Sequence, residues 1–364
     1  MGDIRPPDSG PCLTLEKLAM KKSLIALAVL AASGTAFAQS SVTLFGIVDA
    51  GYASVKNGST ATAGSTSKSG ITNSGLNSSR LGFRGVEDLG GGLKAGFWLE
   101  TALANDSDAT SVNFARRSTV SLMGGFGEVR IGRDYTPTFW NTTVYDPFGT
   151  NGIGQASTPG LIGSSNTTAV RANNSVSYFT PDMGGLSGQI MIAFGENTQT
   201  SGTPTVKTGN YMGLRGGYAA GPLSVHVATG KLNGATAAAD VKTSNFGASY
   251  DLGMVKPFLF VGQEKNAAAK VGAVEIGATA PVGAGTIRAA FSKYDLKNSP
   301  SESSKLALGY VHDLSKRTSL YGTFAMVSNK GGATLSVANN GLTNAAANAS
   351  GKSTGYEVGV KHSF

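Results

Sequence analysis

The sequence is poor in cysteine, in charge and in long apolar runs. Cys12 is the single cysteine of 364 residues, so disulfide frameworks and cysteine-based metal sites are excluded. Charged residues make up 14% of the chain, whereas apolar residues make up an ordinary 40%. After residue 38, no stretch is both apolar and long enough for a transmembrane helix. The chain must therefore distribute its apolar residues in alternation with polar ones.

Histidine is scarce as well. The three histidines, His226, His312 and His362, fall in separate strands or turns, and we expect them to point outward. Their spacing suggests neither a metal cluster nor a Ser-His-Asp triad. A hydrolase on this chain would need a nucleophile and a base that meet by chance. We therefore predict that the protein is not an enzyme and that it uses no metal or cofactor.

The formal net charge of +8 raises the question of a nucleic-acid partner. The basic residues are scattered, and their longest runs are the pairs at 116–117 and 316–317. A nucleic-acid surface concentrates its basic residues, so we predict no such partner. An excess of basic over acidic residues would also suit a channel that conducts anions.

Residues 20–38 have the pattern of a secretory signal peptide. A basic MKK opens the segment, a short apolar run follows, and AFA precedes Gln39 as the cleavage site. We expect residues 39–364 to form one mature domain. Residues 1–19 look unlike a targeting segment and are interpreted as a non-native or mis-assigned extension.

The rest of the chain is a long series of segments in which apolar and polar residues alternate. Phe246, Ala248 and Tyr250 share one face of such a segment, and their neighbours on the other face are polar. The C-terminus ends in a similar strand. One candidate strand, 257–262, is apolar on both faces and fits the pattern less well.

The connections alternate between tight turns and long polar loops. Turns containing Gly, Asp or Pro are expected at 87–91, 124–127, 181–185, 220–222, 251–253, 281–285 and 312–315. Long segments are expected at 56–76, 135–170, 196–208, 231–243, 295–304 and 328–353. Short turns at one rim and long loops at the other are typical of bacterial outer-membrane β-barrels.

This pattern gives about sixteen strands, each with the roughly ten residues that a tilted membrane strand needs. A barrel of this width encloses water, and its closed sheet leaves no unpaired edge to lipid. A secreted β-sandwich would use similar strands. The single uninterrupted series, without a linker that would divide it into two sandwiches, favours the barrel.

Several motifs, in their order and spacing, resemble those of the Gram-negative general porins, particularly the betaproteobacterial branch. The motifs are SVTLFG (41–46), SRLGFRGVEDLGGGLKA (79–95), RRSTVSL (116–122), GEVRIGR (127–133), RANNSVSY (171–178) and the terminal Phe364. The resemblance covers nearly all of residues 41–364. It implies an all-β transmembrane antiparallel barrel with short periplasmic turns and long external loops.

The resemblance also implies function and partners. A porin lies in the outer membrane among lipid and lipopolysaccharide, forms a homotrimer, and lets small anions and other hydrophilic solutes diffuse passively. The assembly machinery of that membrane recognises the final aromatic residue, which is Phe364 here. The third external loop of the family folds into the barrel, and the matching segment here contains Tyr135, Tyr145, Asp146 and Phe148.

Strand parity places several arginines in the lumen. Leu81 and Phe83 mark an outward face, so Arg80 and Arg84 point inward, and the same rule applied to other strands excludes Arg116. The predicted basic wall consists of Arg80, Arg84, Arg117, Arg130 and Arg171. Arg84 and Arg130 depend mainly on parity, because the resemblance supports only the other three.

The charge of the third loop predicts the selectivity of the pore. Many enteric relatives oppose the arginines with several acidic loop residues, whereas Asp146 is the only acid between residues 135 and 170 here. We therefore predict a positive constriction and an anion-preferring pore. The alternatives left open are a substrate-specific channel and an adhesin that uses the long loops. Because only Trp98 and Trp140 could contribute tryptophan to an aromatic slide, general diffusion is favoured.

Overall fold

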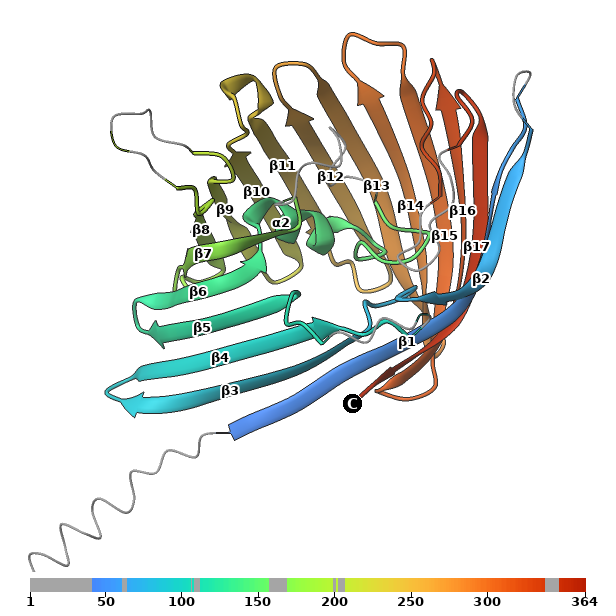
Figure 1. Ribbon diagram of the computed structural model, residues 1–364. Coiled ribbons are helices and arrows are strands. Elements are labelled where there is room, and N and C mark those ends of the chain that lie inside the picture. Colours follow the sequence, from blue (N-terminus) through green and yellow to red (C-terminus); the bar gives the residue numbers. More distant parts are fainter. Residues whose placement is uncertain are drawn as a thin grey trace, which may run out of the picture.

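The computed structural model describes residues 41–60, 64–105, 107, 112–156, 169–198, 201, 207–337 and 347–364. The predicted extension and signal peptide therefore lie outside the described residues. The described chain forms one antiparallel sheet, which closes on itself because the first strand pairs with the last. Figure 1 shows this sheet as a curved wall with a helix on its inner side.

The sheet contains seventeen strand segments within the described ranges. They are β1 (Ser41–Asn57), β2 (Thr66–Asn73), β3 (Arg80–Gly90), β4 (Leu93–Ala102), β5 (Arg117–Gly124), β6 (Gly127–Tyr135), β7 (Arg171–Phe179), β8 (Leu186–Ala193), β9 (Tyr211–Ala220), β10 (Leu223–Leu232), β11 (Val241–Tyr250), β12 (Lys256–Lys265), β13 (Lys270–Val282), β14 (Gly285–Leu296), β15 (Glu302–Asp313), β16 (Thr318–Lys330) and β17 (Lys352–Ser363). The helical segments are α2 (Pro137–Tyr145) and the short 3-10 turn η1 (Ala237–Ala239). No helix among the described residues is long and apolar enough to cross a membrane.

The segments β2 and β3 are two parts of one barrel strand. The later half of β1 pairs with β2 and its first residues pair with β3, so both lie along the same edge of β1. Residues 74–79 leave the sheet between them. The Asp49 carboxylate holds this bulge by accepting backbone N–H groups of Leu76 (2.8 Å) and Asn77 (2.6 Å). The barrel therefore has sixteen strands, which confirms the expected number.

The two rims of the barrel differ as predicted. All seven predicted turns join neighbouring strands at one rim, called here the short-turn rim, and the predicted long segments lie at the opposite loop rim. The sequence pattern missed two connections at the loop rim, 103–116 and 266–269. The predicted loop 56–76 was also too long, because 66–73 forms β2, a strand made mostly of exposed polar residues.

The outer face of the barrel is apolar. Val120 is 64% exposed and Ile276 55% exposed, and comparable side chains project from nearly every strand. The inner face carries polar residues such as Ser121 and Ser175, which are almost completely covered. This distribution is the reverse of that in a soluble domain and suits a barrel surrounded by lipid.

A compact apolar core lies inside the barrel. It is built from small inner-wall residues of β1 and β14–β16 together with side chains from two inward-folded loops: Ala53, Val55, Phe148, Ile153, Ala290, Ala307, Ala325, Val327 and Val337. The inward-folded third loop, predicted from the resemblance, is thereby confirmed. The lumen is accordingly part solvent channel and part packed interior.

Candidate pore constriction

The third loop, residues 136–170, enters the barrel through α2. Thr136 is the N-cap of α2, and its Oγ1 accepts the backbone N–H of Phe139 at 3.3 Å. Pro137 follows at the first helical position, where its missing N–H costs nothing. These residues make a helix begin directly after β6, with its side facing the inner wall of β8–β12.

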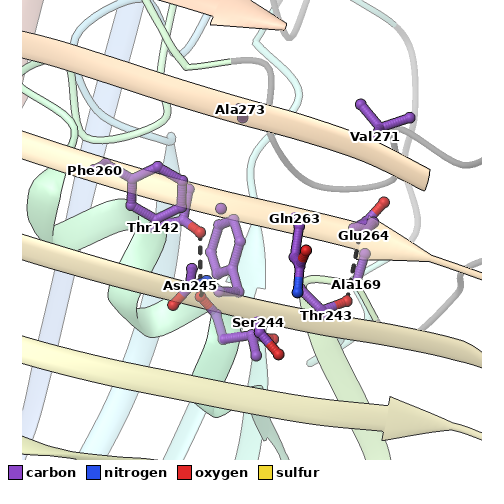
Figure 2. A pocket seen from close by; sticks show the side chains of 13 residues that line it. Thr142, Ala169, Thr243, Ser244, Asn245, Phe260, Gln263, Glu264, Val271 and Ala273 are labelled. Atoms are coloured by element: carbon purple, nitrogen blue, oxygen red, sulfur yellow. Dashed lines mark hydrogen bonds between the residues drawn. The ribbon is translucent and has the colours of Figure 1, made fainter. Parts of the chain in front are cut away.

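The contact of α2 with the wall explains the strand that is apolar on both faces. Phe260 of β12 points inward and is only 2% exposed, because α2 covers it. Asn245 of β11 donates from Nδ2 to the Thr138 carbonyl at 2.9 Å. Figure 2 shows Thr142, Asn245 and Phe260 around the residual cavity, whose volume is about 20 Å³. The inner face of β12 is therefore packed against α2 rather than exposed to solvent.

The far end of the loop is fixed by buried charges. The Asp146 carboxylate accepts the backbone N–H groups of Phe148 (2.8 Å), Thr150 (2.8 Å) and Ala156 (2.9 Å). Burial raises the pKa of this Asp146 carboxyl. Lys305 of β15, 1% exposed, donates from Nζ to the carbonyl oxygen of Gln155 at 2.6 Å. These bonds set the height at which the loop crosses the lumen.

A carboxylate from a second strand also holds the loop. Glu357 of β17 is fully buried, and its Oε2 accepts the backbone N–H of Ile153 at 3.1 Å. Its Oε1 accepts the hydroxyl of Thr72 at 3.3 Å. The loop is thus also fixed beside β1, where the first and last strands of the barrel pair.

Three arginines lie close together on the basic wall, and two of them contact Glu100. The Glu100 Oε1 lies 2.6 Å from Arg116 Nε and 3.4 Å from Arg80 Nη1. Arg171 stacks on the ring of Tyr135, with its Cζ 4.4 Å from the ring centroid, and donates from Nη2 to the Tyr135 hydroxyl at 2.9 Å. Arg116 Nη2 reaches the same hydroxyl at 3.3 Å. Tyr135 therefore joins two guanidinium groups that would otherwise repel each other.

These residues face an open cavity of about 880 Å³. Its charged lining among the described residues consists of Arg80, Arg116 and Arg171, without an acidic residue. The opposite lining comes from the third loop and is neutral and polar, with Thr150 and Asn151 among its members. We name this space the basic cavity, because one wall is cationic and the other carries no charge.

A second arginine group lies nearer the short-turn rim. Arg84 and Arg117 lie on either side of Trp98, with their Cζ atoms 5.2 and 4.5 Å from its ring. Arg117 and Arg130 share the carboxylate of Asp134, at 3.7 and 2.5 Å. A cavity of about 380 Å³ contains these three arginines and also Glu128. With two carboxylates beside three arginines, this group is more nearly neutral than the basic cavity.

The five predicted arginines all lie on the inner side, but in two groups rather than on one level. Arg80 and Arg171 belong to the basic cavity, and Arg84, Arg117 and Arg130 belong to the second group. The exclusion of Arg116 was wrong. Arg116 precedes the first residue of β5, so strand parity does not apply to it, and its side chain turns inward to Glu100.

The sequence analysis counted acidic residues only in the third loop, so it missed the acidic partners of the arginines that lie on the strands. Glu100, Glu128 and Asp134 come from the strands and contact the arginines directly. Parity could have found Glu100, because Phe97 points outward and Glu100 lies three positions later in β4. The sequence offers no signal for which arginine each carboxylate contacts.

The four predicted loop residues have different positions. Tyr135 faces the basic cavity. Tyr145 is completely buried, and its hydroxyl lies 2.8 Å from Ser224 Oγ on the wall. Asp146 and Phe148 are likewise covered, at 5% exposure each. Of these four, only Tyr135 borders the open cavity, whereas the other three are covered and hold the loop in place.

His226 was wrongly expected to point outward. It is 4% exposed, and its Nδ1 lies 2.6 Å from the Tyr145 hydroxyl while Nε2 lies 3.0 Å from Ser187 Oγ. Although these three side chains form a chain of hydrogen bonds, α2 covers the imidazole, so the contacts position the helix. Among the described residues, no cluster of histidine, cysteine and acidic side chains could hold a metal ion.

Comparison with known proteins agrees with this geometry. Residues 24–333 match the family described as Gram-negative porin. The chain is 44% identical to outer membrane porin protein 32 of Delftia acidovorans, with 95% of this chain and 100% of the relative aligned. An outer membrane porin protein of Bordetella pertussis is 31% identical over 95% of this chain and all of its own.

Solved structures show the same fold. An anion-selective porin from Comamonas acidovorans superposes with a TM-score of 0.79 at 40% identity, covering 90% of this chain and 100% of its own. OmpT of Vibrio cholerae, solved in a trimer form, gives a TM-score of 0.62 at 16% identity and covers 89% of this chain and 99% of its own.

Proposed function

The chain belongs to the Gram-negative porin family, and we propose that it forms an anion-preferring diffusion channel. As an outer-membrane porin it is a channel rather than an enzyme, and it lets small hydrophilic solutes pass. The basic cavity is the observation that carries the anion preference. Its three arginines face a neutral loop, so the narrow zone has a net positive potential.

The placement of the carboxylates also supports a positive electrostatic potential in the basic cavity. Glu100 offsets one of the three arginines of the basic cavity and leaves about two positive charges beside the path. Asp146, within the third loop, is 5% exposed and does not line this cavity. Walls of low dielectric constant strengthen such a potential, which concentrates anions and repels cations. A protein of 40% identity and the same fold is itself an anion-selective porin.

The reversal potential in a salt gradient tests the proposal. The purified protein is inserted into a planar bilayer with a tenfold gradient of potassium chloride. We expect the sign that corresponds to chloride permeating faster than potassium. A reversal potential of the opposite sign would show that the arginines do not set selectivity.

The constriction residues are part of the proposal. We assign Arg80, Arg116 and Arg171 to the selective zone, with Tyr135 orienting two of them, and Arg84, Arg117 and Arg130 to an approach of weaker charge. Liposome swelling with a graded set of sugars separates general diffusion from a specific channel. A cutoff by size alone supports general diffusion, whereas saturable uptake of one sugar would support the specific channel.

Assembly is also proposed rather than observed. Porins of this fold form trimers, as OmpT does, and we propose a homotrimer here, which unheated migration on a denaturing gel would reveal. Phe364 directly follows the last strand, exchanges backbone hydrogen bonds of 3.1 Å with Gly46, and is 44% exposed. This accessible aromatic end suits the proposed recognition by the assembly machinery. Cleavage after residue 38 would give Gln39 as the N-terminus of the exported protein.

A further inference from the structure

Two aromatic rings pack together on the inner wall between the basic cavity and the short-turn rim. Phe45 of β1 pairs in register with Gly82, and Trp98 of β4 pairs with Arg84, so both side chains project on the inner face. Their ring centroids lie 4.9 Å apart, with the ring planes at 59°. The interior of an outer-membrane barrel is generally polar. This ring pair therefore indicates a role beyond lining a path for water and ions.

Arg84 lies over both rings as an exposed cation. Its Cζ is 5.4 Å from the ring centroid of Phe45 and 5.2 Å from that of Trp98. The other two arginines of the second group have acidic partners, Asp134 and Glu128. Arg84 has no carboxylate within ion-pair distance in the part of the chain that the structure describes. Its guanidinium group therefore remains available for a solute.

The wall beside Trp98 has a shallow apolar floor on its short-turn side. Gly96 lies two residues before Trp98 on the same face of β4, and it pairs with Val86 and with Ser121. A Cβ at Gly96 would lie 2.9 Å from the Met123 Cε and 3.7 Å from the Val86 Cγ2. Because Gly96 has no side chain, these two apolar groups form the floor, and Val86 is 46% exposed there. The cavity of about 380 Å³ described above contains this floor.

We propose that this cavity binds a planar aromatic carboxylate on its way through the channel. The ring lies on the apolar floor beside Trp98, and the carboxylate accepts hydrogen bonds from Arg84. A guanidinium group suits both parts of such a solute, because it stacks on aromatic faces and pairs with carboxylates.

The chemistry of the cavity separates this solute from simpler ones. An inorganic anion would use the arginines but not the floor, and a neutral aromatic molecule would use the floor but not the charge of Arg84. Glu128, the acidic residue that lines the cavity, is already bonded to Arg130 by two hydrogen bonds of 2.9 and 3.0 Å. The inference rests on the proposed channel, because a solute reaches the cavity through the lumen, but not on the preference for chloride.

Block of the chloride current tests the proposal. The purified protein is inserted into a planar bilayer, and benzoate, cyclohexanecarboxylate or benzamide is added on both sides. Cyclohexanecarboxylate keeps the charge without the flat aromatic ring, and benzamide keeps the ring without the charge. The variants are Arg84→Gln and Arg84→Lys, and the control Arg317→Gln removes one positive charge from an exposed turn. Migration of the unheated protein and the open-channel conductance show that each variant is folded.

We expect benzoate to block at about one fifth of the concentration that cyclohexanecarboxylate needs, since a cation–π contact contributes about a fivefold factor. Arg84→Gln should raise the half-blocking concentration of benzoate about tenfold, because the unpaired cation is lost. Arg84→Lys should raise it about threefold, because lysine keeps the charge but not the planar group. The control should change it less than about twofold. Benzamide should block about tenfold more weakly than benzoate.

Equal block by benzoate and cyclohexanecarboxylate would overturn the proposal. So would an unchanged benzoate block in Arg84→Gln, which would place the blocking site at the basic cavity instead. The sign of the reversal potential, measured on the same channels, reports separately on the proposed anion preference.

Discussion

Charged side chains project from both halves of the inner wall, yet the two halves use them differently. On β3–β7, Arg80 and Arg171 face a cavity of about 880 Å³. On β13–β17, Lys305 and Glu357 are almost completely covered and hydrogen-bond to the third loop. The third loop makes the difference, because it packs on one half and leaves the other open.

This contrast shows that an inward charge has no fixed role in a barrel. An uncovered charge keeps its hydration and acts on passing ions through its potential. A covered charge loses its hydration, and it is tolerated only because partners replace the lost water. Mutations on the two sides should therefore alter different properties of the protein.

The largest expected effect is on the covered side. Replacement of Lys305 by Met leaves the Gln155 carbonyl without its charged donor and removes the positive charge that acts on the buried carboxyl groups of Asp146 and Glu275. We expect the free energy of unfolding to fall by about 1.5–3 kcal/mol, as when a buried hydrogen bond to a charged group is lost. Urea unfolding in detergent micelles measures this change.

The matched control for this variant is Lys293→Met on the neighbouring strand β14. Lys293 is 52% exposed, so we expect a change of less than about 0.5 kcal/mol. The reversal potential of Lys305→Met should keep its sign, because the arginines remain. A stability loss equal to that of the control would show that the loop does not depend on Lys305.

The next effect is on the open side. The double variant Arg116→Gln and Arg171→Gln removes two positive charges from the basic cavity. We expect the permeability of chloride relative to potassium to fall about tenfold, which corresponds to about 1.4 kcal/mol. Reversal potentials measure the ratio. Stability should fall less than in Lys305→Met, since Arg80 remains beside Glu100 when Arg116 is replaced.

The double variant Lys316→Gln and Arg317→Gln provides its control. These residues lie in the turn between β15 and β16 at the short-turn rim. Their substitution removes the same amount of positive charge, but far from the basic cavity. Selectivity should stay within a factor of two. If both double variants lowered selectivity equally, the net charge of the protein rather than the basic cavity would be responsible.

The smallest expected effect has the opposite sign. Glu100→Gln removes the carboxylate that offsets Arg80 and Arg116, so the cavity becomes more positive. We expect chloride preference to rise about two- to threefold, a change of roughly 0.5 kcal/mol. Reversal potentials again provide the measurement, with Asp251→Asn in a short turn as the control. A fall in chloride preference would mean that Glu100 acts mainly by holding the arginines in place.

Much of this architecture could be predicted because sheet periodicity is local. The outward positions of Leu81 and Phe83 placed Arg80 and Arg84 correctly, since successive residues of a strand point to opposite faces. The seven turns were found because each reversal needs Gly, Asp or Pro. Parity failed at Arg116, which lies one residue before β5.

The barrel, its two unequal rims and the apolar outer face can be predicted from the amino-acid sequence, because each follows from residues close together in the chain. Which inward charges stay open and which are covered depends on how the folded third loop packs against the wall. Lys305 and Arg80 look alike in their strands, and only the third loop, docked 150 residues away from Lys305 in the chain, separates them. Such docking depends on many contacts between distant segments, and no short pattern encodes them.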